Sequence, residues 1–278
     1  MLEASSHVIA FYNRHPISRD QILASVRGRR GSIEALQPAD LYPYDQDHYG
    51  GLAAVDALAQ RIGVRPGLDV VDLCAGLGGP ARYLAAHYGV NVVCVELNAG
   101  RAAGAYDLTG RVGLSQRVRV VRADAQHIPL KSGSVDAVIS QEALLHVPDK
   151  GAALRESYRI LNAGGLLAFT DWALPRELAP ADRDAMWRGI AAQTVQTYES
   201  YRALVTGAGF RVRSEEELTA QWGVILAERF RMYTALRDEA RSAGNPEGDD
   251  AFYSAYARFV ELVQAGQLGG VRLVAEKP

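Results

Sequence analysis

The chain has 278 residues, enough for one elaborated domain with a sizeable core. Hydrophobic residues make up 48% and charged residues 22%, and the net charge of −2 is unlike that of a nucleic-acid-binding protein. No apolar run could span a bilayer, the first residues are unlike a secretory signal, and two cysteines are too few for a disulfide framework. We therefore expect a cytoplasmic protein without nucleic-acid or membrane partners.

Two helices are expected first, near residues 2–13 and 18–28. Short apolar runs then alternate with helical patterns, and the chain ends with two helices within 222–265, a turn-rich loop at 242–250 between them, and a last strand. This alternation predicts α/β architecture with a doubly wound, mostly parallel sheet. The strands are expected at 68–73, 90–97, 117–124, 134–141, 166–172 and 269–277, and the helices between them at 79–89, 98–112 and 150–165.

A glycine-rich turn follows the first strand, in the run from Asp72 through Gly76 to Gly79. Glycines at a strand-to-helix turn let the backbone approach a ligand closely, and the helix start offers free N–H groups. Glu96 closes the second strand, where a carboxylate can accept the ribose hydroxyls of a nucleoside. These features predict a nucleotide site, and by themselves they leave a dinucleotide oxidoreductase open.

The ordered motifs resemble those of class I methyltransferases that use S-adenosylmethionine (SAM). Asp72, Gly76, Gly78 and Gly79 match the family's first motif, in which Cys74 stands where the family has its first glycine. The resemblance covers roughly residues 50–220. It implies a Rossmann-like, seven-stranded methyltransferase sheet with SAM as the cofactor, and it implies that Asp124 and Ala125 read the adenine. The domains expected are a helical lid at 1–50, a SAM-binding core at 51–221, a helical cap insertion at 222–266, and the last core strand at 267–278.

The segment 140–150, with His146 near its middle, is similar to that of the sarcosine/dimethylglycine and phosphoethanolamine N-methyltransferases. Segments 49–51 and 269–275 also resemble theirs. This resemblance implies methyl transfer to a small-molecule amine by an enzyme of the EC 2.1.1 type. A neutral histidine suits proton removal or orientation near pH 7, and a tyrosine from the lid is its expected partner.

The candidate site residues fall into three groups. The catalytic candidates are His146, Glu142 and Tyr49. The cofactor-binding candidates are Asp72, Gly76, Gly78, Glu96, Leu97, Asp124, Ala125, Gln126, Gln141, Tyr49 and Gly51. The substrate-binding candidates are Tyr42, Tyr44, His48, Asp171, Trp172 and Trp222.

The acceptor atom stays open at this stage, because acceptor choice depends on the outer helices and loops. The alternatives are C- or O-methylation of a secondary metabolite such as a prenyl diphosphate, and a SAM-binding module without catalysis. No metal is expected, since Asp47, His48 and His146 have no ligand spacing. Whether two copies associate as a homodimer is also open.

Overall fold

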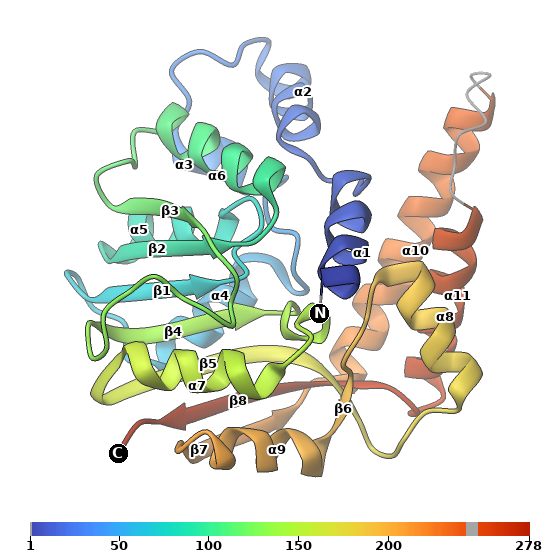
Figure 1. The fold of residues 1–278 in the computed structure, drawn as a ribbon. Coiled ribbons are helices and arrows are strands. Elements are labelled where there is room, and N and C mark those ends of the chain that lie inside the picture. The colour runs from blue at the N-terminus through green and yellow to red at the C-terminus, as the bar shows by residue number, and fades with distance from the viewer. Residues whose placement is uncertain (1, 243–249) are drawn as a thin grey trace.

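The computed structural model describes residues 2–242 and 250–278 of the chain (Figure 1). Its sheet has the strand order β3-β2-β1-β4-β5-β8-β7, and the short β6 pairs with β5 beside this path. The first five strands run parallel, and β8 runs antiparallel to both β5 and β7. The strands are β1 (Asp69–Leu73), β2 (Asn91–Glu96), β3 (Val118–Arg122), β4 (Val135–Gln141), β5 (Leu161–Leu174), β6 (Gln196–Thr197), β7 (Arg211–Glu217) and β8 (Gly269–Glu276).

Helices flank the sheet and also form the part of the molecule beside its carboxyl edge. The helices are α1 (Leu2–Asn13), α2 (Arg19–Arg30), α3 (Pro38–Leu41), α4 (Gly51–Arg61), α5 (Gly79–Tyr88), α6 (Ala99–Arg111), η1 (Leu144–His146), α7 (Lys150–Ile160), α8 (Pro180–Ile190), α9 (Tyr198–Gly207), α10 (Thr219–Ser242) and α11 (Asp250–Gln264). Both expected N-terminal helices are present, and α2 begins after Ser18, whose side chain caps it.

Alternate residues of the central strands enter two different cores. Val70 and Val92 pack with α4 and α5, whereas Val71 and Val93 pack with α7 and α9 on the opposite face. This follows from the two-residue period of a strand, and both faces are apolar because helices cover both. The expected doubly wound, mostly parallel sheet is therefore confirmed, with β6 as an added short strand.

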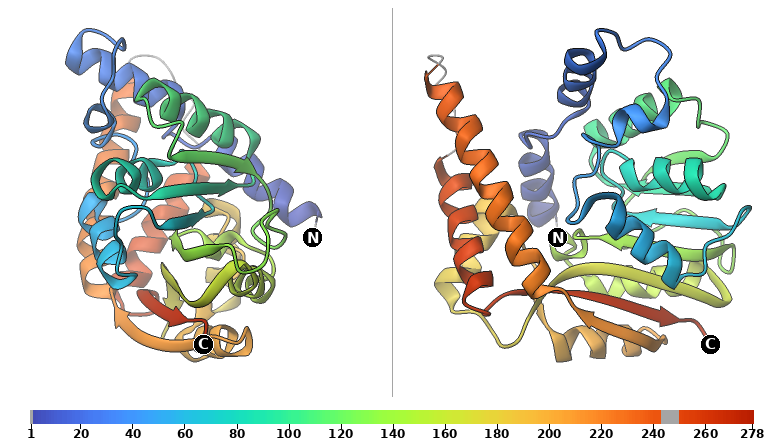
Figure 2. Two further views of the ribbon diagram at one scale, coloured as in Figure 1. Left: turned by 90° about the vertical axis from the view of Figure 1, so that its left-hand side faces the viewer. Right: turned by 180° about the vertical axis from the view of Figure 1, so that it is seen from behind.

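A third core lies beyond the sheet, where α8, α10 and α11 pack around Trp172, Trp222 and Phe259. Figures 1 and 2 show α10 and α11 side by side as a pair that extends away from the sheet, with α1 between this pair and the strands. The N-terminal helix is thus placed over the edge where parallel strands end. In the described residues, no helix combines the length and apolar character of a membrane span.

The helix expected over 150–165 ends earlier, at Ile160. The chain turns extended at Leu161, so the segment 161–165 already belongs to β5. Gly165 approaches β4 so closely that an added Cβ would lie 3.0 Å from the carbonyl oxygen of Asp136. The close approach of the two strands explains why residue 165 is a glycine, although the sequence pattern suggested that it belongs to a turn that ends the helix. Most of the expected loop at 242–250 lies outside the described residues.

Candidate active site

Two neighbouring pockets open at the carboxyl edge of the parallel strands. The first lies over the ends of β1, β2 and β4, and the second lies between that edge and the helices α1, α8, α10 and α11. Four side chains line both pockets, and they come from α1, a loop before α4, and the segment after β4. These shared residues are Tyr12, Asp47, Glu142 and His146.

The glycine-rich turn forms the floor of the first pocket. Cys74 adopts φ +60°, and Gly76 and Gly78 have φ of +57° and +75°. Cys74 therefore takes up the left-handed conformation that a glycine would adopt at lower cost, which is how this chain keeps the turn without the family's first glycine. A side chain at Gly79 would clash with the carbonyl of Asp45, so the loop around residue 45 packs directly on this turn.

Glu96 joins the turn to the second strand. Its Oε2 accepts from the Gly76 N–H at 2.8 Å, and its Oε1 accepts from the Asn98 N–H at 2.7 Å. Burial raises the pKa of Glu96, while these hydrogen bonds oppose that rise. A carboxylate oxygen has further lone pairs, so Glu96 can still accept from a ligand in the pocket that it lines.

Asp72 and Gln141 present buried acceptor atoms to the first pocket. Asp72 Oδ2 and Gln141 Oε1 have no hydrogen-bond partner within the described residues. Burial, and secondarily the charge of Glu96, raise the pKa of Asp72 to about 7. Buried polar atoms are rarely left unpaired, so these two point to a ligand that donates hydrogen bonds or carries positive charge.

The segment after β3 contributes a third acidic group. The Asp124 carboxylate accepts from the Gln126 main-chain N–H at 2.9 Å and from its side-chain amide at 3.0 Å. Asp124, Ala125 and Gln126 all line the first pocket. The local hydrogen bonds hold the Asp124 carboxylate in one orientation at the pocket wall.

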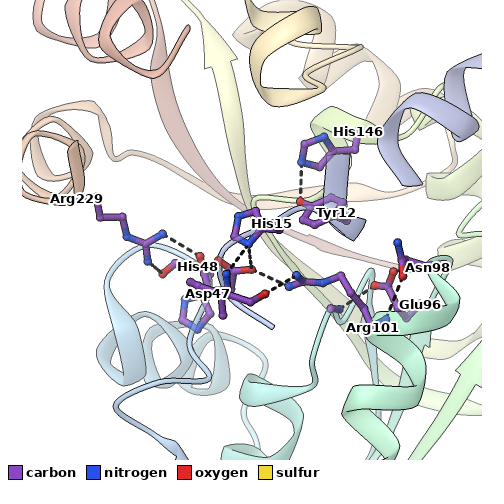
Figure 3. A network of polar contacts seen from close by, with 11 residues as sticks. Tyr12, His15, Asp47, His48, Glu96, Asn98, Arg101, His146 and Arg229 are labelled. Carbon is purple, nitrogen blue, oxygen red and sulfur yellow. Dashed lines mark hydrogen bonds and ion pairs between the residues drawn. The ribbon is translucent and has the colours of Figure 1, made fainter. Parts of the chain in front are cut away.

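Three arginines from three helices hold the loop before α4, and Arg82 and Arg101 are buried. Arg82 pairs with Asp45 at 2.9 Å in a fully buried ion pair, and Arg101 pairs with Asp47 at 2.7 Å. Arg229, from α10, donates to two consecutive main-chain carbonyls, that of Asp47 at 3.0 Å and the next at 2.6 Å (Figure 3). Because this loop lines both pockets, the three arginines couple the shape of one pocket to that of the other.

His48 lies in the same loop and is held as a neutral ring. Its Nδ1 accepts from the Gln141 amide at 3.0 Å, which leaves Nε2 to donate to Gln46 Oε1 at 2.9 Å. Burial lowers the pKa of His48 to about 4. The ring thus joins the loop to the end of β4.

Tyr12 and His146 meet at the junction of the two pockets (Figure 3). His146 Nδ1 lies 2.8 Å from the carbonyl oxygen of Ala191, so this nitrogen carries the proton and donates. His146 Nε2 then accepts from the Tyr12 hydroxyl at 2.9 Å. Burial lowers the pKa of His146 to about 4 and raises that of Tyr12, so both side chains are neutral at pH 7.

Glu142 follows β4 in a left-handed conformation with φ +45°, which is uncommon for a side chain of its size. Its carboxylate accepts from the Tyr49 N–H at 2.6 Å and from the Thr170 hydroxyl at 2.5 Å. Burial outweighs these hydrogen bonds and raises the pKa of Glu142 to about 7. A carboxyl group with that pKa can take up or release a proton near neutral pH.

Aromatic rings form most of the second pocket. Tyr49 packs edge-on against Trp172 and Trp222, and the Arg229 guanidinium carbon lies 4.8 Å from the centre of the Tyr49 ring. Other rings that line this pocket are Phe11, Tyr233, Tyr256 and Phe259.

Most of the cofactor-binding candidates gather in the first pocket. Gly78 and Gly51 instead cap or begin the helices α5 and α4. Tyr49 lines the second pocket, together with Trp172 and the catalytic candidates His146 and Glu142. The candidates that line the first pocket are Asp72, Gly76, Glu96, Leu97, Asp124, Ala125, Gln126 and Gln141, together with His48 from the substrate-binding group.

Four substrate-binding candidates line neither pocket. Tyr42 packs edge-on against Tyr83, and Tyr44 packs beside α2. Trp222 packs edge-on against the Tyr49 ring.

Asp171 is the fourth, and its carboxylate is already fully engaged. It accepts from Lys150 Nζ at 2.8 Å and from the Tyr201 hydroxyl at 2.7 Å. Its second oxygen accepts from the Leu145 N–H, so Asp171 supports the η1 turn that carries His146.

Several lining residues were missed from the sequence. Asn98 could have been found, because it caps α6 directly after the acidic residue that closes β2. Nothing in the local pattern points to the others, since their side chains reach the site only through packing of distant elements. They are Tyr12, His15, Asp45, Arg101, Arg229, Tyr233 and Tyr256.

Residues 71–169 match the methyltransferase domain family. The chain is therefore similar to methyltransferases over this part of its length. It is 31% identical over 167 residues to a sarcosine/dimethylglycine N-methyltransferase of Halorhodospira halochloris, covering 60% of this chain and 59% of that protein. It is 30% identical over 174 residues to the methyltransferase GfsG of Streptomyces halstedii, covering 62% and 63%. The chain thus spans less than two thirds of these two relatives.

Solved structures share the fold over nearly the whole length of this chain. A putative sarcosine dimethylglycine methyltransferase from Galdieria sulphuraria superposes with a TM-score of 0.75 and 23% identity, covering 93% of this chain and 98% of that one. A phosphoethanolamine N-methyltransferase 2 of Haemonchus contortus gives 0.76 and 19%, covering 98% and 60%. These likenesses confirm the Rossmann-like methyltransferase fold.

Methyltransferase domains of this kind use SAM as their cofactor. The first pocket fits that molecule, because SAM carries an ammonium, a sulfonium, ribose hydroxyls and an adenine amino group. Each of these is positively charged or donates hydrogen bonds, and the pocket offers the acceptors Asp72, Glu96, Asp124 and Gln141. The strongest support for SAM in this pocket comes from the oxygens of Asp72 and Gln141 that have no hydrogen-bond partner within the described residues.

Proposed function

We propose that the chain is an active SAM-dependent methyltransferase of the EC 2.1.1 type, which methylates the nitrogen of a small-molecule amine. The observation that supports this proposal is that the two pockets share four polar side chains. An acceptor in the second pocket would therefore meet a cofactor in the first one at Tyr12, Asp47, Glu142 and His146. Within this proposal, residues 1–50 serve as the lid and 222–266 as the cap over the acceptor.

The chemistry asks little of the protein beyond position. When bound, SAM supplies a methyl group already activated by a positively charged sulfur. The chain holds the acceptor in line with that methyl group, which by itself lowers the barrier through proximity. An ammonium has no lone pair, so a protein group must also take its proton.

Glu142 is better suited than His146 to take that proton. The pKa is about 7 for Glu142 and about 4 for His146. Proton transfer from an amine to Glu142 is therefore easier by about 4 kcal/mol, at about 1.36 kcal/mol for each pKa unit. His146 then orients Tyr12, whose oxygen can accept an N–H of the amine, since its own proton is engaged by His146.

A second candidate is O-methylation, because a carboxylate base next to the pocket would also serve a hydroxyl acceptor. One relative, 28% identical over 228 residues and covering 80% of this chain and 82% of that protein, is named as a 27-O-demethylrifamycin SV methyltransferase of Amycolatopsis mediterranei. C-methylation of a prenyl diphosphate remains a further alternative, with Glu142 as base.

The test is a screen of metabolite extracts with isotopically labelled SAM. The proposal expects a labelled product that is heavier by one methylene group, with the label on nitrogen. Label on oxygen or carbon would favour the alternatives. Tight binding of S-adenosylhomocysteine (SAH) without any labelled product would favour a non-catalytic SAM-binding module.

A further inference from the structure

The second pocket contains very little free positive charge. Among the described residues that line it, Arg229 is the one cation at neutral pH. Burial lowers the pKa of both His15 and His146, so these rings are neutral. No described lysine lines this pocket.

The Arg229 side chain is already engaged with the protein. Its two Nη atoms donate to the main-chain carbonyls of Asp47 and His48, and its guanidinium lies over the Tyr49 ring. A phosphate or carboxylate in this pocket would have to share Arg229 with these two carbonyls and with the nearby Asp47 carboxylate. At most one ion pair would therefore be available to the anion, with a cation whose charge Asp47 already partly offsets.

Acidic groups face the same space. Asp47 is compensated by Arg101, but Glu142 has no described cation within ion-pair distance, and its hydrogen bonds come from the neutral groups of Tyr49 and Thr170. An anion placed beside Glu142 would be repelled by its carboxylate or would hold that carboxyl in the protonated form, which cannot act as the base. The anion would also be left largely unpaired in a buried site, which is costly. A cation there would instead supply the missing counter-charge.

The remaining walls are apolar and aromatic. Phe11, Trp172 and Phe259 line the pocket with Leu145 and Ile190. Such walls stabilise an apolar body by removing it from water, and ring faces also attract ammonium groups.

We infer that the acceptor is an amine on an apolar, ring-bearing body that carries neither phosphate nor carboxylate. This inference rests on the proposed function, because it takes the second pocket as the acceptor site. It separates this chain from the relatives named for sarcosine and for phosphoethanolamine, whose named substrates each carry an anionic group.

Two matched pairs of compounds test the inference: phenethylamine against phenylalanine, and ethanolamine against phosphoethanolamine. Each pair differs by one anionic group. Binding to the SAH-saturated protein is measured by calorimetry, and methylation is measured as kcat/KM. The amine without the anion should be favoured at least about tenfold in each pair, and phenethylamine should be the best of the four.

The matched variants are Ile190→Lys, which adds an unpaired ammonium to the pocket wall, and Ile190→Met, which changes shape without charge. With SAH affinity retained, the lysine variant should narrow the preference for phenethylamine over phenylalanine, and the methionine variant should not. An unchanged preference in the lysine variant contradicts the inference.

The inference and the proposed function fail in different ways. Equal or better use of phenylalanine or phosphoethanolamine overturns the inference and at the same time supports an active methyltransferase. Failure of all four compounds to bind the SAH complex also overturns the inference. Failure of the protein to bind SAH, or to label any compound in an extract, counts against the proposed function.

Discussion

The Tyr12 hydroxyl donates to His146 Nε2 at 2.9 Å, although the two residues are 134 positions apart in the chain. Tyr12 comes from the N-terminal helix, and His146 from the turn after β4. Their contact therefore links the helix over the site to the edge of the sheet, at the place where both pockets meet.

Tyr12→Phe and His146→Leu should each lower kcat by about tenfold to a hundredfold while SAH affinity stays within about threefold. The reason is that each removes one partner of the hydrogen bond that orients the Tyr12 oxygen toward the acceptor. Because the pair acts as a unit, the double variant should lose much less than the product of the two single losses. The double-mutant cycle is measured by steady-state kinetics on the wild type, the two single variants and the double variant, with calorimetry for SAH affinity. Independent, multiplicative losses would mean that the two side chains do not act through their contact.

Glu142 should give the pH–rate profile its acid limb. Its pKa is raised to about 7, and the base must be ionised, so kcat/KM should fall about tenfold per pH unit below pH 7 and level off above it. Glu142→Gln should remove this limb and lower the plateau by at least about a hundredfold. A profile that is the same in wild type and variant would assign the proton to another group.

The raised pKa of Glu142 also affects stability: activity should rise with pH, whereas the free energy of unfolding should fall. A carboxyl whose folded pKa lies above its unfolded value of 4.5 binds more protons in the folded state, so stability falls as pH rises from about 4.5 to 7. Above pH 7, Glu142→Gln should therefore be at least as stable as wild type, by up to about 3 kcal/mol. Denaturant titrations at pH 5 and pH 8 measure the difference, and a variant that is less stable only at pH 8 would contradict it.

Glu96→Ala should weaken SAH binding by about tenfold to a hundredfold, which corresponds to the loss of charge-assisted hydrogen bonds worth about 1.5–3 kcal/mol. Part of this loss comes from the turn itself, because Glu96 also accepts from Gly76 and Asn98. Glu96→Gln is the matched control, since it keeps an oxygen for one of these N–H groups. Calorimetry with SAH on the folded proteins measures this loss of affinity. Equal affinity in wild type and Glu96→Ala would show that Glu96 does not bind the cofactor.

Arg229→Lys should loosen the loop before α4, because one ammonium cannot donate to two consecutive carbonyls in the geometry of a guanidinium. We expect faster amide hydrogen exchange over residues 45–51 and about tenfold weaker binding of both SAH and acceptor. Arg188→Ala is the control, since Arg188 is exposed and pairs with its helix neighbour Asp184. An unchanged exchange pattern in Arg229→Lys would show that Arg82 and Arg101 suffice to hold the loop.

Asp171→Asn separates a structural role from a substrate-binding one. The variant leaves Lys150 buried without its ionic partner, so unfolding should become easier by about 3–5 kcal/mol. The denaturant midpoint should shift accordingly. A variant of normal stability with a raised KM for the acceptor would instead restore Asp171 to the acceptor site.

The sequence by itself determined the sheet and the first pocket. Alternating apolar runs and helical patterns predict the parallel strands, because both faces of such a sheet must be covered. The end of each strand then places Asp72, Glu96 and Asp124 at one edge, since parallel strands share their direction. The position of Cys74 in the glycine-rich turn can also be predicted from the sequence, because that turn is formed by residues close together in the chain.

Only the tertiary structure decided the second pocket. Arg229 and Tyr12 reach it from helices at opposite ends of the chain, and no spacing in the sequence relates those helices. Asp171 is the opposite case. It lies near the carboxyl end of its strand, where the sequence predicts a ligand-binding residue, but its carboxylate accepts from Lys150 instead. The physical reason is that strand direction fixes which end of a strand faces the ligand, whereas long-range packing fixes which side chains from other elements reach it.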